Sequence, residues 1–532
     1  MKQSILLIGF FAFFLSAYAQ DTSDKKAIEG WHNLDRVSDQ YMGVSSLKAY
    51  EFLKGKDSRT IIVAVIDAGV DINHEDLVGN IWVNEGEIAG NGIDDDKNGY
   101  VDDVHGWNFI GDVVHDTYEA TRMFVMYSTR FEDKTADQIS KSDKKDFDQY
   151  MSLKSEIKRQ VEENQSQLTS VSNFSVMFQK SNRLMKAYLD TEEVTIELLT
   201  GVSSTDAKIT GARDMVKYAL ETGFNEQEIL DYLDHLHIIL DYGYNLEFDP
   251  RPTIGDNFED VYEKYYGNST LYYDDQSHGT QVAGVIAAKR GNNIGIDGIA
   301  DNVKIMAIRA VPDGDERDKD IANAIIYAVD NGAHIINMSF GKRFSPRKEA
   351  VDKAIQYAES KGVLLIHASG NDGKDIDIRD NFPTRTYSNS NKSAKGWLEI
   401  GASSWGDGSN FVASFSNYGK KTVDVFAPGV AIYSTSPGNT YDSVDGTSFA
   451  SPLTAGVAAL VMSYYPELDS KQVAKLIMDS SIKFLDLEVN KPGEYEGEPD
   501  MIKFSELSRS GGIINAYEAV KMAESMKVGS KN

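Results

Sequence analysis

The run Thr60-Ile61-Ile62-Val63-Ala64-Val65-Ile66-Asp67-Ala68-Gly69-Val70 is apolar and rich in β-branched residues up to its Asp-x-Gly ending. Such a run is typical of a central parallel strand that is buried on both faces of a sheet. The carboxyl ends of these strands are where α/β proteins place their chemistry. Asp67 therefore stands where a functional carboxylate is expected, and an aspartate that merely ends a strand and caps a turn is the common alternative.

A second stretch, Asp445-Gly446-Thr447-Ser448-Phe449-Ala450-Ser451-Pro452, leads into an apolar, alanine-rich segment that continues to Val461. We predict a buried helix with Pro452 in its first turn, where the missing N–H costs least. Ser448 would then lie at a helix start, where free backbone N–H groups favour a developing negative charge. Most such serines are caps or surface hydroxyls, so a nucleophile here also needs a base, an orienting acid and an oxyanion donor.

Strands and helices alternate from Asp275 onward. The predicted strands are residues 303–311, 334–341, 363–372, 398–402 and 423–427, and the predicted helices are residues 277–288, 320–330, 346–361 and 470–479. This alternation predicts a doubly wound α/β fold with a mainly parallel sheet flanked by helices. His278 begins one of the helices after a polar turn, which suits a catalytic histidine, although a lone histidine is more often a surface or satisfied core residue.

Residues 112–272 interrupt this pattern. The chain contains neither glycine nor proline from Asp112 to Thr200, and its apolar residues recur at helical spacing as far as residue 242. We predict a mainly α-helical insertion that covers or flanks the core, with residues 243–272 as an aromatic and acidic return loop. Our hypothesis is that it restricts access to large substrates, and excising residues 112–242 and comparing casein with a short peptide would test it.

The chain ends and the bulk composition limit the function classes. Lys2, the apolar run from Ile5 to Leu15 and an Ala-x-Ala site read as a secretory signal peptide over residues 1–19. That run is too short to span a bilayer, and no second long apolar run follows. The net charge of −28 argues against a nucleic-acid role, and the absence of cysteine excludes disulfides. We expect an exported protein, periplasmic or extracellular, without an integral membrane segment after signal removal.

The acidic run from Asn91 to Asp103 follows the spacing of a calcium loop. Side-chain oxygens stand at loop positions 1, 3, 5 and 9, glycine at position 6 and a backbone carbonyl at position 7, but the twelfth place is His105 instead of glutamate. The alternative is an acidic turn that faces water. The predicted ligands of a structural calcium ion are Asp94, Asp96, Asn98, the carbonyl of Tyr100, and Asp102.

Four blocks of this core together resemble the signature blocks of the subtilisin-like serine proteases, the subtilases. They are Asp67-Ala68-Gly69, His278-Gly279-Thr280-Gln281-Val282-Ala283-Gly284, Ser369-Gly370-Asn371 and Gly446-Thr447-Ser448-Phe449-Ala450-Ser451-Pro452. The resemblance covers roughly residues 60–111 and 273–525, and Gly511 to Ala516 resembles the glycine-rich close of that core. The implied organisation is an N-terminal extension over residues 20–59, a catalytic domain in two parts (60–111 and 273–525) around the insertion, and a polar tail over residues 526–532.

The resemblance also assigns roles to single residues. It implies a catalytic triad of Asp67, His278 and Ser448, with Asn371 and the backbone N–H of Ser448 stabilising the oxyanion. It further implies two edges that pair with an extended peptide and line the pocket for the residue before the scissile bond, the P1 residue. Those edges are Ser339, Phe340 and Gly341 on one side and Ala368, Ser369 and Gly370 on the other.

The function implied is an exported serine endopeptidase that acts on protein or peptide substrates through an acyl-enzyme, with no cofactor needed for the chemistry. A catalytically silent binding protein that uses the helical insertion is the second reading, which the intact set of four catalytic positions disfavours. An esterase or peptide ligase with the same triad is a third. Two departures from the family stand out: 211 positions separate Asp67 from His278, and the extension is short for the usual inhibitory propeptide.

Overall fold

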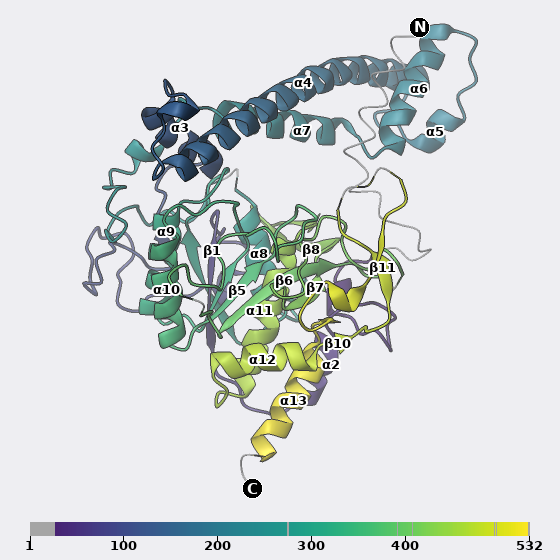
Figure 1. Cartoon of the computed structure of the whole chain (residues 1–532). Coiled ribbons are helices and arrows are strands. Elements are labelled where there is room, and N and C mark those ends of the chain that lie inside the picture. Colours follow the sequence, from purple (N-terminus) through teal and green to yellow (C-terminus); the bar gives the residue numbers. More distant parts are fainter. Residues whose placement is uncertain are drawn as a thin grey trace. The chain divides into compact units, whose positions relative to one another are not determined.

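The computed structural model describes residues 27–273, 276–390, 392–406, 408–493, 495 and 497–529. The predicted signal peptide lies outside these residues. The chain divides into two compact units (Figure 1). The smaller consists, among the described residues, of residues 114–250, and the larger holds the remaining described residues on both sides of that segment.

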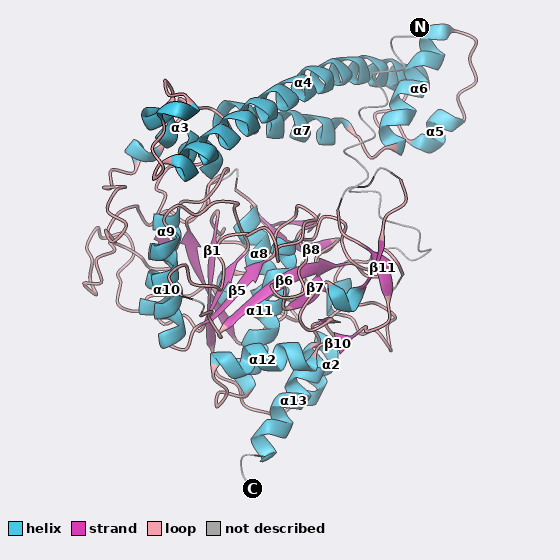
Figure 2. Ribbon diagram, viewed as in Figure 1, coloured by secondary structure: helices cyan, strands magenta, loops and turns pink. Residues whose placement is uncertain are grey.

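A nine-stranded sheet forms the centre of the larger unit in the described part of the chain (Figure 2). Its order is β10-β13-β7-β6-β5-β4-β1-β3-β2, and all neighbours pair in parallel except β10 with β13. The strands are β1 (Ile61–Asp67), β2 (Gly106–Asn108), β3 (Val303–Arg309), β4 (Ile335–Met338), β5 (Leu364–Ala368), β6 (Trp397–Ser403), β7 (Val425–Pro428), β10 (Ile482–Lys483) and β13 (Gly512–Ile513). The predicted doubly wound, mainly parallel fold is confirmed.

Helices cover both faces of this sheet. One hydrophobic cluster joins the sheet to α2 (Ser46–Leu53), α8 (His278–Ala287), α11 (Thr447–Tyr464), α12 (Ser470–Ser480) and α13 (Ala516–Gly529). The other joins it to α9 (Asp318–Asp330) and α10 (Lys348–Ser360). The side chains of β1 alternate between the two, with Val63 and Val65 in the first cluster and Ala64 and Ile66 in the second. This explains why the strand carries no polar face.

Shorter elements complete the larger unit. Two hairpins are formed by β8 (Ile432–Ser436) with β9 (Thr440–Val444), and by β11 (Glu488–Asn490) with β12 (Met501–Lys503). Single helical turns are η1 (Trp31–Asn33), η2 (Val78–Asn80), η5 (Arg251–Thr253) and η6 (Phe504–Glu506). Helix α13 continues to Gly529, so the first part of the predicted tail is helical.

The smaller unit is helical. Its elements are α3 (Glu119–Phe131), η3 (Ala136–Gln138), α4 (Lys144–Leu189), α5 (Ile196–Thr200), α6 (Ala207–Glu221), α7 (Glu226–Ile238) and η4 (Ile239–Gly243). The 46 residues of α4 give a helix about 69 Å long. Val171, Phe178 and Met185, spaced by seven residues, form the α4 side of a cluster with α6 and α7. A second cluster near the other end of α4 contains Phe131, Phe147 and Tyr150.

Residues 251–272 belong to the larger unit, whereas the sequence interpretation carried the insertion to residue 272. Arg251 forms ion pairs with Asp256 and Asp320, and the Tyr266 hydroxyl donates to Asp320 at 2.7 Å. Asp320 lies on α9, so these contacts bind the segment to the sheet's helical layer. A return loop without regular structure carries no pattern that indicates which unit it packs against.

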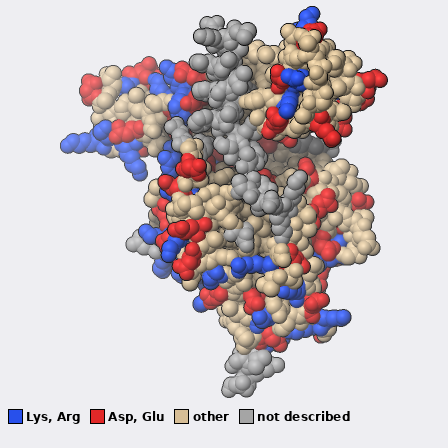
Figure 3. All heavy atoms as spheres, turned by 90° about the vertical axis from the view of Figure 1, so that its right-hand side faces the viewer, with Lys and Arg blue, Asp and Glu red and all other residues tan. Residues whose placement is uncertain are grey.

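The surface charge and the composition of the helices bear on possible partners. Acidic and basic side chains are interspersed over the face drawn in Figure 3, with no continuous basic band there. Among the described residues, no helix combines the length and the apolar composition that crossing a bilayer requires.

Candidate active site

The carboxyl end of β1 and the first turn of α8 bring Asp67 and His278 together. The Asp67 Oδ1 atom lies 2.7 Å from His278 Nδ1 and also accepts a hydrogen bond of 2.8 Å from the backbone N–H of Ala68. Asp67 is 1% exposed, whereas the His278 side chain is 38% exposed. Gly279 makes this approach of helix to strand available, since a Cβ there would lie 2.1 Å from the carbonyl oxygen of Gly69.

The electrostatic surroundings of His278 favour its protonated form. Burial opposes the imidazolium and is the largest single influence on the ring. The charge and hydrogen bond of Asp67, together with the charge of Asp313, outweigh it and raise the pKa of His278 above its ordinary value of 6.5. The pair therefore has the character of a base whose protonated form is stabilised by a buried carboxylate.

Ser448 is the second residue of α11 and is half-buried. Its hydroxyl donates to the carbonyl oxygen of Ser339 at 3.0 Å, and the Ser339 hydroxyl donates back to the carbonyl oxygen of Ser448 at 2.8 Å. Among the described residues the structure gives no hydrogen bond between Ser448 and His278. In structures without substrate, catalytic hydrogen bonds are often long or absent, so this geometry leaves Ser448 a candidate nucleophile.

Asn371 follows β5 and is exposed. Its side-chain oxygen accepts from the backbone N–H of Thr447 at 2.9 Å and from the Thr447 hydroxyl at 2.8 Å. Because Oδ1 accepts both of these hydrogen bonds, the Asn371 amide N–H groups remain as the donors of this side chain. Sequence reasoning missed Thr447, because a threonine between a glycine and a serine has the composition of an ordinary turn.

The two predicted substrate-binding edges lie on either side of one side chain, Asn381. The Asn381 amide donates to the carbonyl oxygen of Ala368 at 3.2 Å. A Cβ added to Gly341 would lie 2.5 Å from Asn381 Oδ1, and one added to Gly370 would lie 3.3 Å from Asn381 Nδ2. The structure therefore brings residues 339–341 and 368–370 to the same place, beside Asn381, which no motif singled out.

A buried polar network holds the start of α11 against β4. Asn337 Nδ2 donates to the Ser339 hydroxyl at 2.9 Å, and the Ser451 hydroxyl donates to Asn337 Oδ1 at 2.8 Å. With the two contacts between Ser339 and Ser448, this network connects strand and helix on both sides of the nucleophile candidate.

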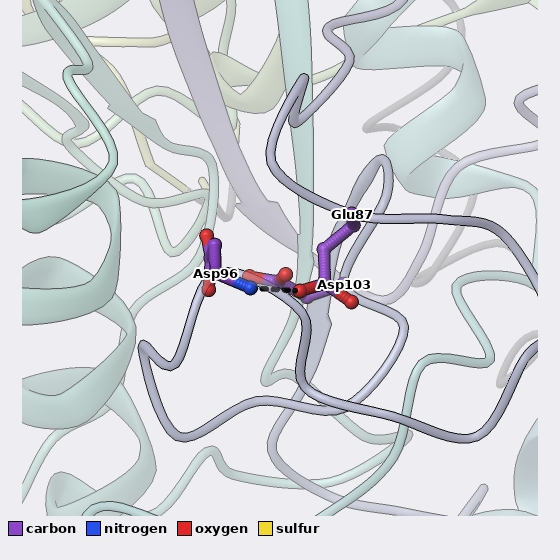
Figure 4. Close-up of side chains that lie close together, drawn as sticks. All are labelled: Glu87, Asp96 and Asp103. Carbon is purple, nitrogen blue, oxygen red and sulfur yellow. Dashed lines mark hydrogen bonds between the residues drawn. The ribbon is translucent and has the colours of Figure 1, made fainter.

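The acidic loop before β2 gathers a different set of groups from the predicted one. Carboxylate oxygens of Glu87, Asp96 and Asp103 all lie within 4.8 Å of one another (Figure 4). Asp102 instead accepts from the backbone N–H groups of Asn91 and Gly92 at 3.1 and 2.9 Å.

Two more of the predicted ligands, Asp94 and Asn98, form hydrogen bonds within the loop. Asp94 accepts from the backbone N–H groups of Asn98 and Gly99 at 3.0 and 2.9 Å. The Asn98 amide donates to Asp96 and Asp103, and its oxygen accepts from the Tyr100 N–H at 2.8 Å. Sequence reasoning missed Glu87, which precedes the loop motif, and Asp103, which the motif passes over in favour of its neighbour.

Known proteins match the part of the chain that contains these candidate site residues. The sequence profile of the subtilase family matches residues 58–505. The chain is similar to the thermophilic serine proteinase of Bacillus sp. strain AK1, with 43% identity over 191 residues, 36% of this chain and 43% of that protein. It is 36% identical over 258 residues to the thermostable alkaline protease of Halalkalibacterium halodurans, covering 48% of this chain and 61% of that one.

A third relative is subtilisin BL of Lederbergia lenta, with 40% identity over 202 residues, 38% of this chain and 68% of that protein. The chain thus spans about half the length of the first two relatives.

Proposed function

The chain belongs to the subtilase family, and on that premise we propose that it is a serine endopeptidase that cleaves protein or peptide substrates through a triad of Asp67, His278 and Ser448. The observation that carries the proposal is the 2.7 Å contact between the buried Asp67 carboxylate and His278. It supplies an oriented base in the same core as a serine at a helix start.

In the proposed acylation step, the Ser448 oxygen attacks the scissile carbonyl carbon while His278 Nε2 accepts the hydroxyl proton. The carbonyl π electrons move to the oxygen, and Asn371 Nδ2 with the Ser448 backbone N–H stabilises the resulting oxyanion. Asp67 keeps Nδ1 protonated and stabilises the imidazolium. Collapse of the tetrahedral intermediate breaks the C–N bond, and His278 returns the proton to the leaving amine.

Deacylation repeats the same steps with water as the nucleophile. His278 takes a proton from water, the hydroxide oxygen attacks the acyl carbon, and the Ser448 oxygen leaves with the proton returned by His278. The products are the acyl part of the substrate, which now ends in a free carboxylic acid, and the free enzyme. No step of this mechanism requires a metal ion or a cofactor.

Fluorophosphonate labelling tests the proposal directly. We expect the wild-type protein to be labelled at Ser448 and to cleave a mixed peptide library. We expect Ser448→Ala to lose labelling and to lower kcat by on the order of 10⁶, the loss known for the nucleophile of subtilisin itself. Folded wild-type protein that takes no label and cleaves nothing would instead favour a catalytically silent binding protein.

We further propose export, with removal of residues 1–19. The composition of those residues supports it. Expression in a bacterial host, followed by N-terminal sequencing of the protein recovered outside the cytoplasm, should return Gln20 as the first residue; recovery of an intact Met1 chain would contradict it.

Finally, we propose that the acidic loop binds a structural calcium ion. Three carboxylates of Glu87, Asp96 and Asp103 converge there, and oxygen donors of this kind are the ligands that calcium prefers. A bound cation would neutralise their mutual repulsion and stabilise the loop, and it takes no part in the chemistry at Ser448.

A further inference from the structure

A second histidine lies directly behind the substrate cleft. His367 is the fourth residue of β5 and is fully buried, and the residue after it, Ala368, begins one of the two substrate-binding edges. Its Nε2 atom lies 2.8 Å from the carbonyl oxygen of Phe340, in the middle of the other edge. Its Nδ1 atom lies 2.9 Å from Oε1 of Glu399 on β6. His367 therefore joins the two edges from the inside.

The hydrogen-bond chemistry fixes how many protons this pair holds. A carbonyl oxygen only accepts, so His367 Nε2 carries a hydrogen. An ionised Glu399 also only accepts, so Nδ1 must then carry a hydrogen as well; a protonated Glu399 would instead donate to a neutral Nδ1. In both arrangements the pair holds one proton more than a neutral imidazole and a carboxylate hold together.

The surroundings of Glu399 are polar and charged. Its second oxygen, Oε2, accepts from the Trp397 indole N–H at 2.9 Å, and its backbone N–H donates to Asp424 at 2.8 Å. Asp424 is in turn paired with Arg385 and Arg509. Trp397 and Glu399 line a cavity of about 1000 Å³.

The contact with Phe340 has a consequence for the cleft wall. The Ser339 carbonyl is held by the Ser448 hydroxyl, and the next carbonyl, that of Phe340, is held by His367. Two successive peptide groups of the wall are thus anchored to different elements, α11 and β5. The far end of the stretch is held by Lys342, whose backbone pairs with that of Phe382 at 3.0 and 2.8 Å. Without the contact to His367, residues 339–341 are held at their two ends, and the carbonyl in the middle loses its anchor.

We propose that His367 is a positioning residue that fixes the wall at residues 339–341 and thereby sets the selectivity for the P1 side chain, with Glu399 holding its Nδ1. This inference rests on the proposed peptidase function. The role belongs to the hydrogen bond to Phe340 and not to the buried charge. A variant that keeps the bond and removes the charge should therefore keep the selectivity.

Three variants separate these roles. His367→Leu removes both bonds. Glu399→Gln keeps them, because the new amide group can donate to Nδ1 of a neutral His367 while its oxygen still accepts from Trp397. His334→Leu is the matched control, since His334 precedes the opposite end of β4 and accepts from the Ile62 N–H at 3.1 Å, away from the cleft. Purified full-length proteins are compared on peptide substrates that differ only at P1, with thermal melting recorded for each.

We expect His367→Leu to lower the ratio of kcat/KM between the best and the poorest P1 residues by roughly two- to tenfold, the range that one net hydrogen bond corresponds to. KM should account for most of the change. Glu399→Gln should retain the P1 ratio of kcat/KM. His334→Leu should lower the melting temperature and leave the P1 ratio unchanged.

The outcomes distinguish this inference from the function on which it rests. If the wild type cleaves peptides but His367→Leu retains the P1 ratio, the inference is wrong and the peptidase function stands. A loss of selectivity in Glu399→Gln equal to that in His367→Leu also contradicts the inference, because the buried charge would then be what matters. If the wild type cleaves no peptide, it is the proposed function that fails.

Discussion

At the scale of single residues, Asn371 illustrates how one side chain aims another. Thr447 donates twice to the Asn371 oxygen, through its backbone N–H and its hydroxyl. An amide that is held by its oxygen presents its N–H groups to the other side. In the proposed mechanism the oxyanion donor is thus oriented before substrate binds, which is the condition for strong stabilisation of a transient charge.

The substitution Asn371→Ala should lower kcat by about 10²–10³, the cost known for the corresponding donor of subtilisin, with little change in KM. Thr447→Val removes one of the two bonds to Asn371 together with the hydroxyl that accepts from the Gly370 N–H, and should cost about two- to tenfold. Steady-state kinetics on one peptide substrate measure both. Equal losses in the two variants would contradict this division of roles between donor and support.

The pH dependence of catalysis follows from His278. Only the neutral imidazole can accept the Ser448 proton, so kcat/KM should rise with pH as His278 loses its proton. Because Asp67 and Asp313 raise the pKa of His278 above 6.5, the midpoint of this rise should lie above pH 6.5.

Asp67→Asn removes the largest of the influences that raise this pKa, so the midpoint should move to lower pH while the rate falls by on the order of 10⁴. Profiles of kcat/KM from pH 5 to pH 9 measure both effects. If the midpoint of the kcat/KM profile in Asp67→Asn were the same as in the wild type, a group other than His278 would control the rise with pH.

At the scale of elements, the connection between β4 and α11 holds the nucleophile candidate in place. Asn337 is fully buried. Its amide donates to the Ser339 hydroxyl after β4 and accepts from the Ser451 hydroxyl on α11. A buried amide that loses a partner costs more than the bond itself contributes, because its desolvation is no longer offset.

Ser451→Ala should therefore lower the free energy of unfolding by about 1–3 kcal/mol. The measurement is urea denaturation in the Ser448→Ala background, which prevents self-cleavage. Ser525→Ala, on the exposed side of α13, is the control and should change stability by less than about 0.5 kcal/mol. A Ser451→Ala variant as stable as this control would mean that Asn337 finds another partner.

The loop that contains Glu87, Asp96 and Asp103 allows the calcium proposal to be tested against the two alternative ligand sets. Calcium at about a hundred times its Kd should stabilise the folded protein by about 2.7 kcal/mol, seen as a higher melting temperature that a chelator reverses. Glu87→Gln should abolish this response. Asp102→Asn should keep it, because Asp102 lies outside the cluster of Glu87, Asp96 and Asp103.

The reverse result, with the response lost only in Asp102→Asn, would favour the ligand set that the loop motif predicts. No response in the wild type would mean that the acidic turn simply faces water.

At the scale of the whole molecule, the two units have separate hydrophobic cores. The three clusters of the larger unit contain no residue from 114–250, and the two clusters of the smaller unit lie wholly within that segment. A unit whose apolar side chains are buried by its own residues has the main requirement for folding alone.

Replacing residues 114–250 by a short Gly-Ser linker should thus leave a protein that melts cooperatively and is labelled by fluorophosphonate at Ser448 as fast as the full chain. Circular dichroism and gel-based labelling measure the two properties. Aggregation, or a broad melting curve without labelling, would mean that the larger unit depends on the helical one.

Much of this architecture could be predicted from the sequence because its signals are local. The strands β1, β3, β4 and β5 are short apolar runs, and Asp67, His278, Asn371 and Ser448 each stand at the end of an element within a contiguous motif. The contacts that support them are not local. His367 meets Glu399 and Phe340, which are 32 and 27 positions away, and no spacing rule connects them.

The same reason explains where the loops of the structure differ from the sequence interpretation. In the acidic loop, adjacent aspartates differ in which way the backbone directs them, and the motif assigned the ligand position to Asp102 while Asp103 joins the cluster. Residues 251–272 have no periodicity, so their place with α9 depends on the ion pairs of Arg251, which only the folded chain reveals.

The position of β1 has a consequence for how the chain is made. This strand is central in the sheet, yet its neighbours β3 and β4 begin at Val303 and Ile335, on the far side of the helical insertion. During synthesis at about 5–20 residues per second, the ribosome needs on the order of ten seconds or more between completing β1 and completing its first partner. Until then Asp67 lies on an unpaired hydrophobic strand and His278 does not yet exist. Such distant pairing implies slow folding and a long exposure to aggregation, and it also means that no nascent chain that ends before His278 can assemble the pair of Asp67 and His278.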